Sequence, residues 1–183
     1  PGPEWQHYIH GGEGGIIPAA NCAARPSRSA VQRGKALEIT STANPEDADW
    51  LTLRVEFIPE EPPEAQRVFL RRFAQASFAF RAFVARDAEA GLLGFAEVAV
   101  RTDFVNGCKH RPALFLEGIY TRPEQRGRGV ARALCEAAGR WGLEQGCREF
   151  ASDVYIDDAD SLAAHRGLGF AETERVVYFR KSL

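Results

Sequence analysis

The stretch LFLEGIYTRPEQRGRGVARAL, residues 114–134, predicts a strand, a short turn and an apolar-faced helix in direct succession. Its second half, EQRGRGVARAL, places two glycines and three arginines at the mouth of the helix. Folding alone does not favour this composition, because glycine costs helix stability and neighbouring arginines repel one another. Glycines do let a backbone approach a ligand closely, and the free N–H groups of a first helical turn attract anions. We therefore expect an anionic group to bind at this turn.

The motif inside this stretch is QRGRGV, residues 125–130. It is not a Walker A loop, because no GKS or GKT follows, and it lacks the third glycine of the dinucleotide-binding fingerprint. The backbone of Gly127 and Gly129 would approach the anion. Positive charge would come from Arg126, Arg128 and Arg132. An ordinary helix start with solvated arginines is the alternative that the motif alone leaves open.

From residue 37 onward, the chain changes repeatedly between helical and strand periodicity. Helices come early, an antiparallel run of strands follows, and a strand–helix–strand–helix–strand sequence ends the chain, which predicts one α/β or α+β domain. The expected strands cover residues 37–40, 80–86, 92–101, 113–120, 148–154 and 171–181. The expected helices cover residues 44–57, 61–76, 127–145 and 157–168.

A few residues give these elements their expected ends and faces. Asn44 as N-cap, with Pro45 at the first helical position, predicts the start of the first helix. The strand over residues 92–101 alternates, which predicts one buried and one wetter face. Tyr178 is expected in the core as part of the last strand. The buried face of the second helix is expected to hold Val68, Phe69 and Phe73.

Composition excludes several classes of protein. With 183 residues, 45% hydrophobic and 26% charged, the chain is able to bury a core as a soluble domain. A formal net charge of −2 argues against general nucleic-acid binding, and no apolar run approaches the roughly 18 residues of a membrane span. The cysteines show no CxxC or CxxH spacing, so we expect neither zinc nor a redox pair, but reduced thiols in the cytoplasm.

Residues 1–36 differ from the rest of the chain. They are rich in Gly, Pro, Ala and Ser and show no periodicity. We interpret them as a flexible N-terminal extension before a domain that covers residues 37–183. The two histidines there, His7 and His10, are not expected to bind metal.

The strand followed by QRGRGV and a helix resembles the acetyl-CoA site of the GNAT superfamily of N-acetyltransferases, where Q/R-x-x-G-x-G/A opens a helix. The resemblance continues through GCREFASDVYIDDADSLAAHRGLGFAETERVVYFRK, residues 146–181, and includes VNGC and FLEGIY upstream. This ending is similar to that of bacterial aminoglycoside 6'-N-acetyltransferases, and the resemblance covers about residues 38–182. It implies the GNAT fold, a mixed and mostly antiparallel sheet with a central splayed strand pair flanked by helices.

The resemblance also implies acetyl-CoA as the acetyl donor and no metal. It assigns the pyrophosphate to the backbone of the loop and first helical turn. Ile119, Tyr120 and Thr121 would pair with the pantetheine arm as an added strand would, in a slot opened by a bulge near Glu117–Gly118. The residues implied around the pyrophosphate are Arg126, Gly127, Arg128, Gly129, Val130, Ala131 and Arg132.

Carboxylates at the ends of predicted elements indicate a second site. Glu117 lies inside an otherwise apolar strand, where an unpaired charge is costly, and Asp153 ends a strand. A solvated acidic rim is the alternative, but a cationic ligand explains both positions better. The resemblance implies aminoglycoside binding at Glu117, Asp153 and Glu174. Aminoglycosides are polycations, which an acidic pocket attracts and orients.

The acceptor amine must lose a proton, because a primary alkyl amine is mostly protonated at neutral pH. Glu117 or Asp153 would take that proton, and the sequence does not choose between them. A backbone N–H near Ile119 would stabilise the oxyanion. His165 stands in HRGLGF where many GNAT enzymes have tyrosine, so it is a candidate acid for the departing thiolate; a packed helix histidine is the alternative. No cysteine nucleophile is implied, so we expect direct transfer in a ternary complex.

Three positions depart from the pattern of the relatives. Ile58 stands where they carry Trp, and Phe104 where they carry Tyr, both in the sugar site. Losing the indole removes a stacking surface, and losing the hydroxyl removes a hydrogen bond worth about 0.5–1.5 kcal/mol. Asp158 stands where they contact the coenzyme with Asn. These changes are compatible with acetyl transfer and bear on the range of accepted drugs.

Three hypotheses follow. The leading one is an aminoglycoside 6'-N-acetyltransferase that confers resistance and, as the resemblance implies, forms a homodimer. The second is a GNAT enzyme for another amine, such as a polyamine or a protein N-terminus. The third is a non-catalytic acyl-CoA-binding module, which acetyl-CoA binding without turnover would support.

Overall fold

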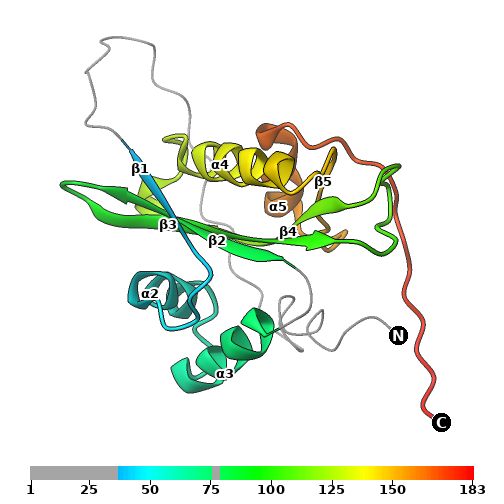
Figure 1. The fold of residues 1–183 in the computed structure, drawn as a ribbon, viewed down its shortest axis with the longest axis horizontal. Helices are drawn as coiled ribbons and strands as arrows, with labels where there is room; N and C mark the ends of the chain where they lie inside the picture. Colours follow the sequence, from blue (N-terminus) through cyan, green and yellow to red (C-terminus); the bar gives the residue numbers. More distant parts are fainter. Residues whose placement is uncertain (1–36, 76–78) are drawn as a thin grey trace.

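A computed structural model describes residues 37–75 and 79–183. Five strands form one sheet, with helices on both of its faces (Figure 1). The predictions for residues 1–36, including His7 and His10, lie outside the described residues. In chain order the elements are β1 (Glu38–Thr42), α2 (Ala48–Phe57), α3 (Pro63–Ala74), β2 (Phe80–Asp87), β3 (Gly91–Arg101), β4 (Ala113–Thr121), the 3-10 helix η1 (Pro123–Gln125), α4 (Val130–Glu144), β5 (Phe150–Ala151) and α5 (Ala159–Leu168).

The sheet has the order β1-β2-β3-β4-β5. The first three pairings are antiparallel, and β5 alone runs parallel to its neighbour β4. The β3–β4 register shifts between Glu97 and Val98, because Glu97 pairs with Gly118 whereas Val98 pairs with Leu116. Glu117 is therefore the extra residue of a bulge in β4. The predicted mixed sheet and the bulge near Glu117–Gly118 are confirmed.

Strands β4 and β5 pair at only two positions, Leu114 with Phe150 and Phe115 with Ala151. Beyond Ala151, β5 ends, whereas β4 continues to Thr121. The two strands therefore separate where the bulge begins, and β4 and β5 are the predicted splayed pair. The expected strand over residues 148–154 is shorter than predicted at both ends, and the bulge follows where its pairing with β4 stops.

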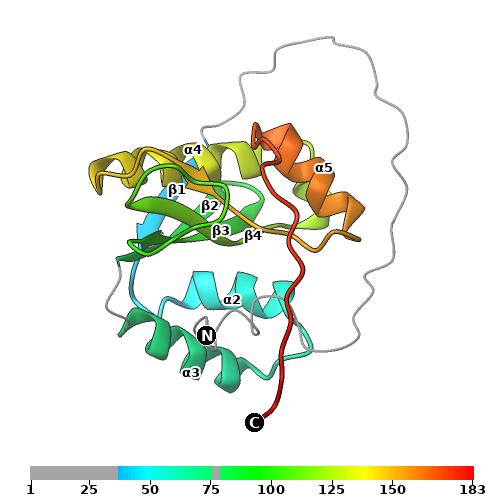
Figure 2. The ribbon, with the colours of Figure 1, turned by 90° about the vertical axis from the view of Figure 1, so that its right-hand side faces the viewer.

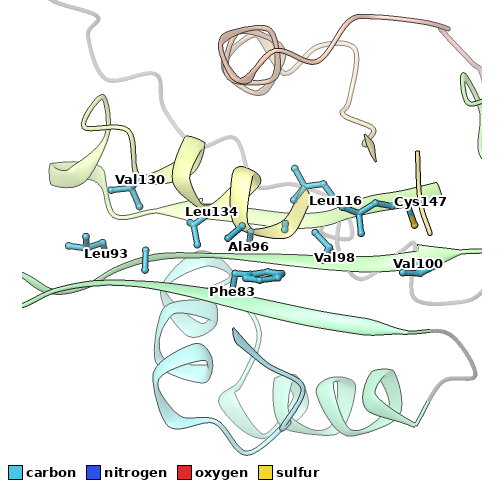
Figure 3. Close-up of a cluster of buried hydrophobic side chains, with 13 residues drawn as sticks. Phe83, Leu93, Ala96, Val98, Val100, Leu116, Val130, Leu134 and Cys147 are labelled. Carbon is cyan, nitrogen blue, oxygen red and sulfur yellow. The ribbon is translucent and has the colours of Figure 1, made fainter. Parts of the chain in front are cut away.

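One core lies between α4 and the sheet (Figure 3). Val130 and Leu134 from α4 pack on Ala96 and Val98 from β3 and on Leu116 from β4. This packing fixes the start of α4 against the two central strands.

A second core lies on the opposite face, under α2 and α3. Trp50, Leu53, Leu70 and Phe73 pack there against Phe95 and its neighbours. Strand β3 is consequently buried on both faces from Leu93 to Val100. The expectation of one wetter face for this strand is wrong, because helices cover both sides of the sheet.

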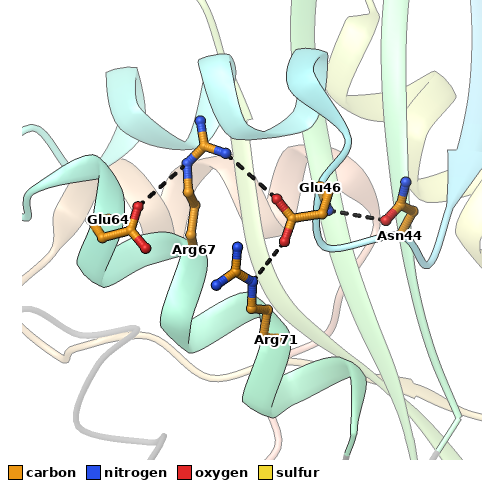
Figure 4. Close-up of polar contacts among 5 residues, drawn as sticks. All are labelled: Asn44, Glu46, Glu64, Arg67 and Arg71. Carbon is orange, nitrogen blue, oxygen red and sulfur yellow. Dashed lines mark hydrogen bonds and ion pairs between the residues drawn. The ribbon is translucent and has the colours of Figure 1, made fainter.

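The start of α2 differs from the prediction. Asp47, not Asn44, is the N-cap, and its side chain accepts from the N–H groups of Asp49 and Trp50. Asn44 instead accepts from the N–H of Glu46 with its side-chain oxygen, in a turn before the helix (Figure 4). Asp47 directly precedes the first helical residue, Ala48, so its carboxylate reaches the free N–H groups of the first turn.

The face of α3 also differs by one position. Phe69 and Phe73 are buried as predicted, together with Gln66 and Leu70, but Val68 is 40% exposed. The side chains of Arg67 and Arg71 extend from this helix and form ion pairs with Glu46 (Figure 4).

The end of the chain corrects the prediction of a last strand. Residues 171–183 form no strand and are exposed. Figure 2 shows this segment running from α5 past the edge of the sheet to the side of α2 and α3. Tyr178 is 77% exposed, so its expected place in the core is wrong. An added strand needs a free neighbour, and β5 offers only two residues of pairing.

Candidate functional site

The bulge of β4 brings a carboxylate into the interior. Glu117 is only 5% exposed. Its partner is Arg101 at the end of β3, whose Nη2 donates to both carboxylate oxygens at 3.0 Å. Burial raises the pKa of Glu117 from 4.5 to about 7, against the lowering effect of Arg101. Glu117 therefore changes its charge near neutral pH, which suits a general base.

A second buried carboxylate lies beneath the bulge. Glu97 accepts from the indole Nε1 of Trp50 at 2.7 Å and pairs with Arg54. Trp50 and Arg54 are one helical turn apart on α2, so this network ties α2 to β3. A Cβ added at Gly118 would lie 3.5 Å from a Glu97 oxygen, an ordinary van der Waals contact, so the bulge lies next to this network.

Asp153 lies close enough to Glu117 to raise its pKa through charge repulsion. Unlike Glu117, it is exposed. The two predicted carboxylates are thus close enough to influence each other, with Glu117 buried and Asp153 exposed to solvent. Glu117 is the one whose pKa lies near 7.

The other predicted acceptor residues are more exposed than Glu117. Ile58 is the C-cap residue after α2 and is half-buried, and Phe104 is 67% exposed in the loop after β3. Glu174 is exposed on the C-terminal segment. The neighbouring Thr173 packs on Gly107, where any Cβ would collide with it, so this segment lies against the loop that carries Phe104.

Both ring nitrogens of His165 contact protein oxygens. Nδ1 lies 2.8 Å from the carbonyl oxygen of Ser161, which only accepts, so Nδ1 carries a hydrogen. Nε2 lies 3.0 Å from the hydroxyl of Ser152, which in turn reaches the carbonyl of Leu116 at 3.4 Å. His165 is thus held by hydrogen bonds and faces the splay of β4 and β5 through the Ser152 hydroxyl.

The glycine turn precedes α4 rather than forming its first turn. Gly127 and Gly129 have φ of 73° and 86°, and α4 begins at Val130. The helix prediction from residue 127 is therefore three residues too long at its start, because both glycines adopt the left-handed conformation. Within the described chain, no side chain caps this helix, and nothing lies within 4 Å of a Cβ placed at either glycine. The N–H groups at the start of α4 are thus open to an anionic ligand.

The arginines of the turn are exposed and differ in their contacts. Arg126 donates to the carbonyl of Thr121, and Arg128 to the side chain of Gln125. Arg132, one turn into α4, donates to the carbonyl of Gly167 and so links α4 to α5. Val130 is buried under the helix and Ala131 is half-buried, so both can offer only their backbone to a ligand.

The free end of β4 leads directly into this turn. Ile119, Tyr120 and Thr121 pair with β3 on one side, beyond the reach of β5 on the other. The hydroxyl of Thr121 is buried without a hydrogen-bond partner among the described residues, which leaves a polar atom for a ligand to satisfy. Asp158 caps α5 by accepting from the N–H of Ser161, and this bond lowers its pKa.

Comparison with known proteins shows the same features elsewhere. Residues 47–170 match the family model described as "Acetyltransferase (GNAT) family". The aminoglycoside N(6')-acetyltransferase type 1 of Serratia marcescens is 47% identical over 134 residues, 73% of this chain and 91% of that protein. Its namesake from Stenotrophomonas maltophilia is 44% identical over 142 residues, 77% of this chain and 91% of that protein.

Solved structures agree. AAC(6')-Iy in complex with the bisubstrate analogue CoA-S-monomethyl-acetylneamine matches with a TM-score of 0.72 at 38% identity, covering 81% of this chain and all of that one. AAC(6')-Ih from Acinetobacter baumannii matches with a TM-score of 0.73 at 33% identity, covering 81% and 99% of the two chains. The chain belongs to the GNAT family of acetyltransferases. Within that family it groups with the aminoglycoside N(6')-acetyltransferases.

This GNAT chain also holds residues that sequence reasoning missed. Arg101 pairs with Glu117, and Glu97 pairs with Arg54 next to the bulge; none of Arg101, Glu97 and Arg54 was predicted. One signal existed for Glu97, which is an acid within the apolar run LLGFAEVAV. Among residues 37–75 and 79–183, no group of three or more His, Cys, Asp and Glu side chains could hold a metal ion. No helix of the same two segments is long and apolar enough to cross a bilayer.

Proposed function

We propose that this protein transfers an acetyl group from acetyl-CoA to the 6'-amine of aminoglycoside antibiotics, and so confers resistance. The observation that carries the proposal is the buried Glu117, with its pKa near 7, at the point where β4 and β5 separate. The names of the relatives support the same acceptor.

The residues present fit acetyl-CoA. The open N–H groups at the start of α4 and the exposed Arg126 and Arg128 suit the pyrophosphate. The free end of β4 and the unpartnered Thr121 hydroxyl suit the pantetheine arm. Asp158 is committed to its helix cap, so we assign it to support of α5 beside the coenzyme rather than to a direct contact.

The chemistry divides between the two ends of the site. Bound acetyl-CoA supplies a thioester that the amine attacks, and its sulfur leaves as a thiol. Ionised Glu117 holds the acceptor ammonium and takes its proton on a carboxylate oxygen, while Asp153 adds attraction for the polycation. The N–H of Ile119 stabilises the charge that develops on the carbonyl oxygen. The departing sulfur takes a proton from the Ser152 hydroxyl, which is replaced from Nε2–H of His165, so this step needs a hydrogen on both ring nitrogens. The second proton that the attacking nitrogen loses returns to His165 through water.

The drug spectrum depends on the more exposed residues. Glu174 would add a third negative charge beside the loop of Phe104. Ile58 and Phe104 offer apolar surface without a hydrogen bond, so we expect them to change KM among aminoglycosides rather than the transfer step.

The proposal is tested by free-thiol release from acetyl-CoA with kanamycin, tobramycin, gentamicin, spermidine and a peptide amine. Release with kanamycin or tobramycin, and none with variants of these drugs that are blocked at the 6'-amine, is expected. Release with spermidine or the peptide alone would move the acceptor to another amine. Binding of acetyl-CoA without release in any sample would favour the non-catalytic module.

We propose further that residues 37–183 form the acetyltransferase domain and that it works as a homodimer in the cytoplasm. The C-terminal segment supports the dimer: Val177 and Phe179 are 77% and 93% exposed, and a second copy of the chain would cover them. Of the described cysteines, Cys108, Cys135 and Cys147 are free thiols, which a reducing compartment maintains. Light scattering should give twice the mass of one chain, and Phe179→Lys should halve it; a monomeric wild type would contradict the dimer.

A further inference from the structure

Arg101 and Glu117 form a pair with fixed geometry. The guanidinium Nη2 reaches both carboxylate oxygens at 3.0 Å, and Nε reaches one of them at 3.2 Å. The Arg101 side chain is 15% exposed and that of Glu117 is 1% exposed. Water therefore screens this pair far less than a surface pair.

A ring holds the guanidinium in place. The Arg101 guanidinium carbon lies 3.4 Å from the centre of the Phe115 ring, which packs in a small cluster with Val105 and Ala113. A planar guanidinium stacks on a ring and presents two parallel donors at once, which a lysine ammonium does not. Phe115 thus helps to fix the direction from which Arg101 approaches Glu117.

The other charged groups around Glu117 act in the opposite sense. Glu97 from β3 and Asp153 from the segment after β5 both raise its pKa by repulsion, and burial raises it most. Arg54 from α2 is engaged with Glu97. Among these groups Arg101 is the cation that contacts the Glu117 carboxylate.

We propose that Arg101 is a positioning residue for acetyl transfer, which acts through Glu117 by keeping its carboxylate charged and aimed at the acceptor amine. The inference rests on the proposed role of Glu117. Arg101 remains protonated throughout and exchanges nothing. In the proton transfer, the N–H bond of the acceptor ammonium breaks and an O–H bond forms on Glu117. The proton then leaves to water as Glu117 ionises again beside Arg101.

The test compares Arg101→Met and Arg101→Lys with wild type by the pH dependence of kcat/KM for kanamycin. Without the cation, the acidic limb should move up by about one pH unit, with about a tenfold loss of kcat/KM at pH 6, below the limb of wild type. Arg101→Lys keeps the positive charge, so the pH of its acidic limb should lie between those of Arg101→Met and wild type. Its kcat/KM should remain below that of wild type, because lysine lacks the two parallel donors. The KM for acetyl-CoA should stay unchanged. If kcat/KM falls but its acidic limb stays at the pH of wild type, Arg101 has only a structural role, and the inference is overturned.

A second measurement does not depend on how far each variant is weakened. If Arg101 acts only through Glu117, then Arg101→Met in the Glu117→Gln background should cost no further activity. An additive loss of about tenfold in the double variant would contradict the inference.

Controls distinguish a failure of the inference about Arg101 from a failure of the proposed function. Arg71→Met breaks another Arg–Glu pair, the exposed one between Arg71 and Glu46 (Figure 4), and should leave the limb where it is in wild type. If wild type releases no thiol with any aminoglycoside, the proposed function fails. If wild type is active and the limb stays in place in both Arg101 variants, the inference alone fails.

Discussion

The two sides of the candidate site are built in opposite ways. On the donor side, exposed backbone does the binding: Gly127 and Gly129 turn the chain and leave the first N–H groups of α4 uncapped within the described chain. On the acceptor side, buried side chains act: Glu117 pairs with Arg101 and feels the charge of a second acid, Glu97. The first side depends on local conformation, and the second on residues brought together from separate strands and α2.

The difference has an energetic consequence. A backbone site costs little stability, because its glycines adopt left-handed φ angles without strain. A buried carboxyl whose pKa is raised from 4.5 to about 7 is destabilising wherever it is ionised. The acceptor side should therefore be the part of the molecule where function and stability conflict.

The largest expected effect comes from removing the base. Glu117→Gln should lower kcat/KM for kanamycin by about 10²- to 10⁴-fold, the usual contribution of a general base. Acetyl-CoA affinity, measured by calorimetry, should not change, because the donor side is built by the other end of β4. The matched control is Glu46→Gln, which removes the carboxylate of an exposed Arg–Glu pair and should leave kcat/KM intact.

The next effect concerns stability and pH. The raised pKa of Glu117 means that the folded protein binds this proton more tightly than the unfolded chain, so its stabilising contribution is complete below pH 4.5 and is lost as pH rises through about 7. At about 1.4 kcal/mol per tenfold change in proton concentration, wild type should lose about 3 kcal/mol relative to Glu117→Gln between pH 4.5 and 7.5. Urea unfolding of both proteins across this range measures the difference. A constant difference would show that Glu117 has an ordinary pKa.

A smaller effect is expected on the donor side. Gly129→Ala should raise the KM for acetyl-CoA by about tenfold, because an L-residue costs about 1–2 kcal/mol at a φ of 86°. Gly139→Ala is the matched control, since this glycine lies inside α4 with an ordinary φ and open space around it. It should leave KM unchanged and stabilise the protein by about 0.5–1 kcal/mol. Equal KM values for acetyl-CoA in Gly129→Ala and Gly139→Ala would contradict binding of the coenzyme by the backbone of the glycine turn.

The smallest effect concerns the acceptor's sugar rings. Phe104→Tyr adds a hydroxyl on an exposed loop residue and should lower the KM for kanamycin by about 2- to 10-fold, corresponding to one hydrogen bond of about 0.5–1.5 kcal/mol. Phe104→Leu adds no donor and should not lower KM. A gain in both variants would point to packing instead of a hydrogen bond.

The same contrast explains what the sequence could predict. The strand, the glycine turn and the helix after it were predictable because their signals are local, and only the start of α4 was misplaced, at Gly127 instead of Val130. The acid Glu117 was also predictable, because a charge stands out in an apolar strand. Arg101 was not, because it is 16 residues away and meets Glu117 only through the β3–β4 pairing and its bulge.

Two further misses have the same physical origin. The alternation in β3 predicted a wet face, but the place of a strand in the sheet decides which faces are covered. Residues 171–181 were predicted to form a last strand, yet β5 pairs at only two positions and offers no longer edge for it. Both outcomes depend on which elements lie next to the strand, and the pattern within a single segment does not give that information.

The most direct measurement is the pH dependence of kcat/KM for kanamycin, recorded for wild type and Glu117→Gln between pH 5 and 9. Wild type should rise about tenfold per pH unit up to about 7 and then level off, because Glu117 must be ionised to take the proton. The residual activity of Glu117→Gln should show no such inflection. The same inflection in both proteins would contradict Glu117 as the base and move that role to another group, with Asp153 as the first to test.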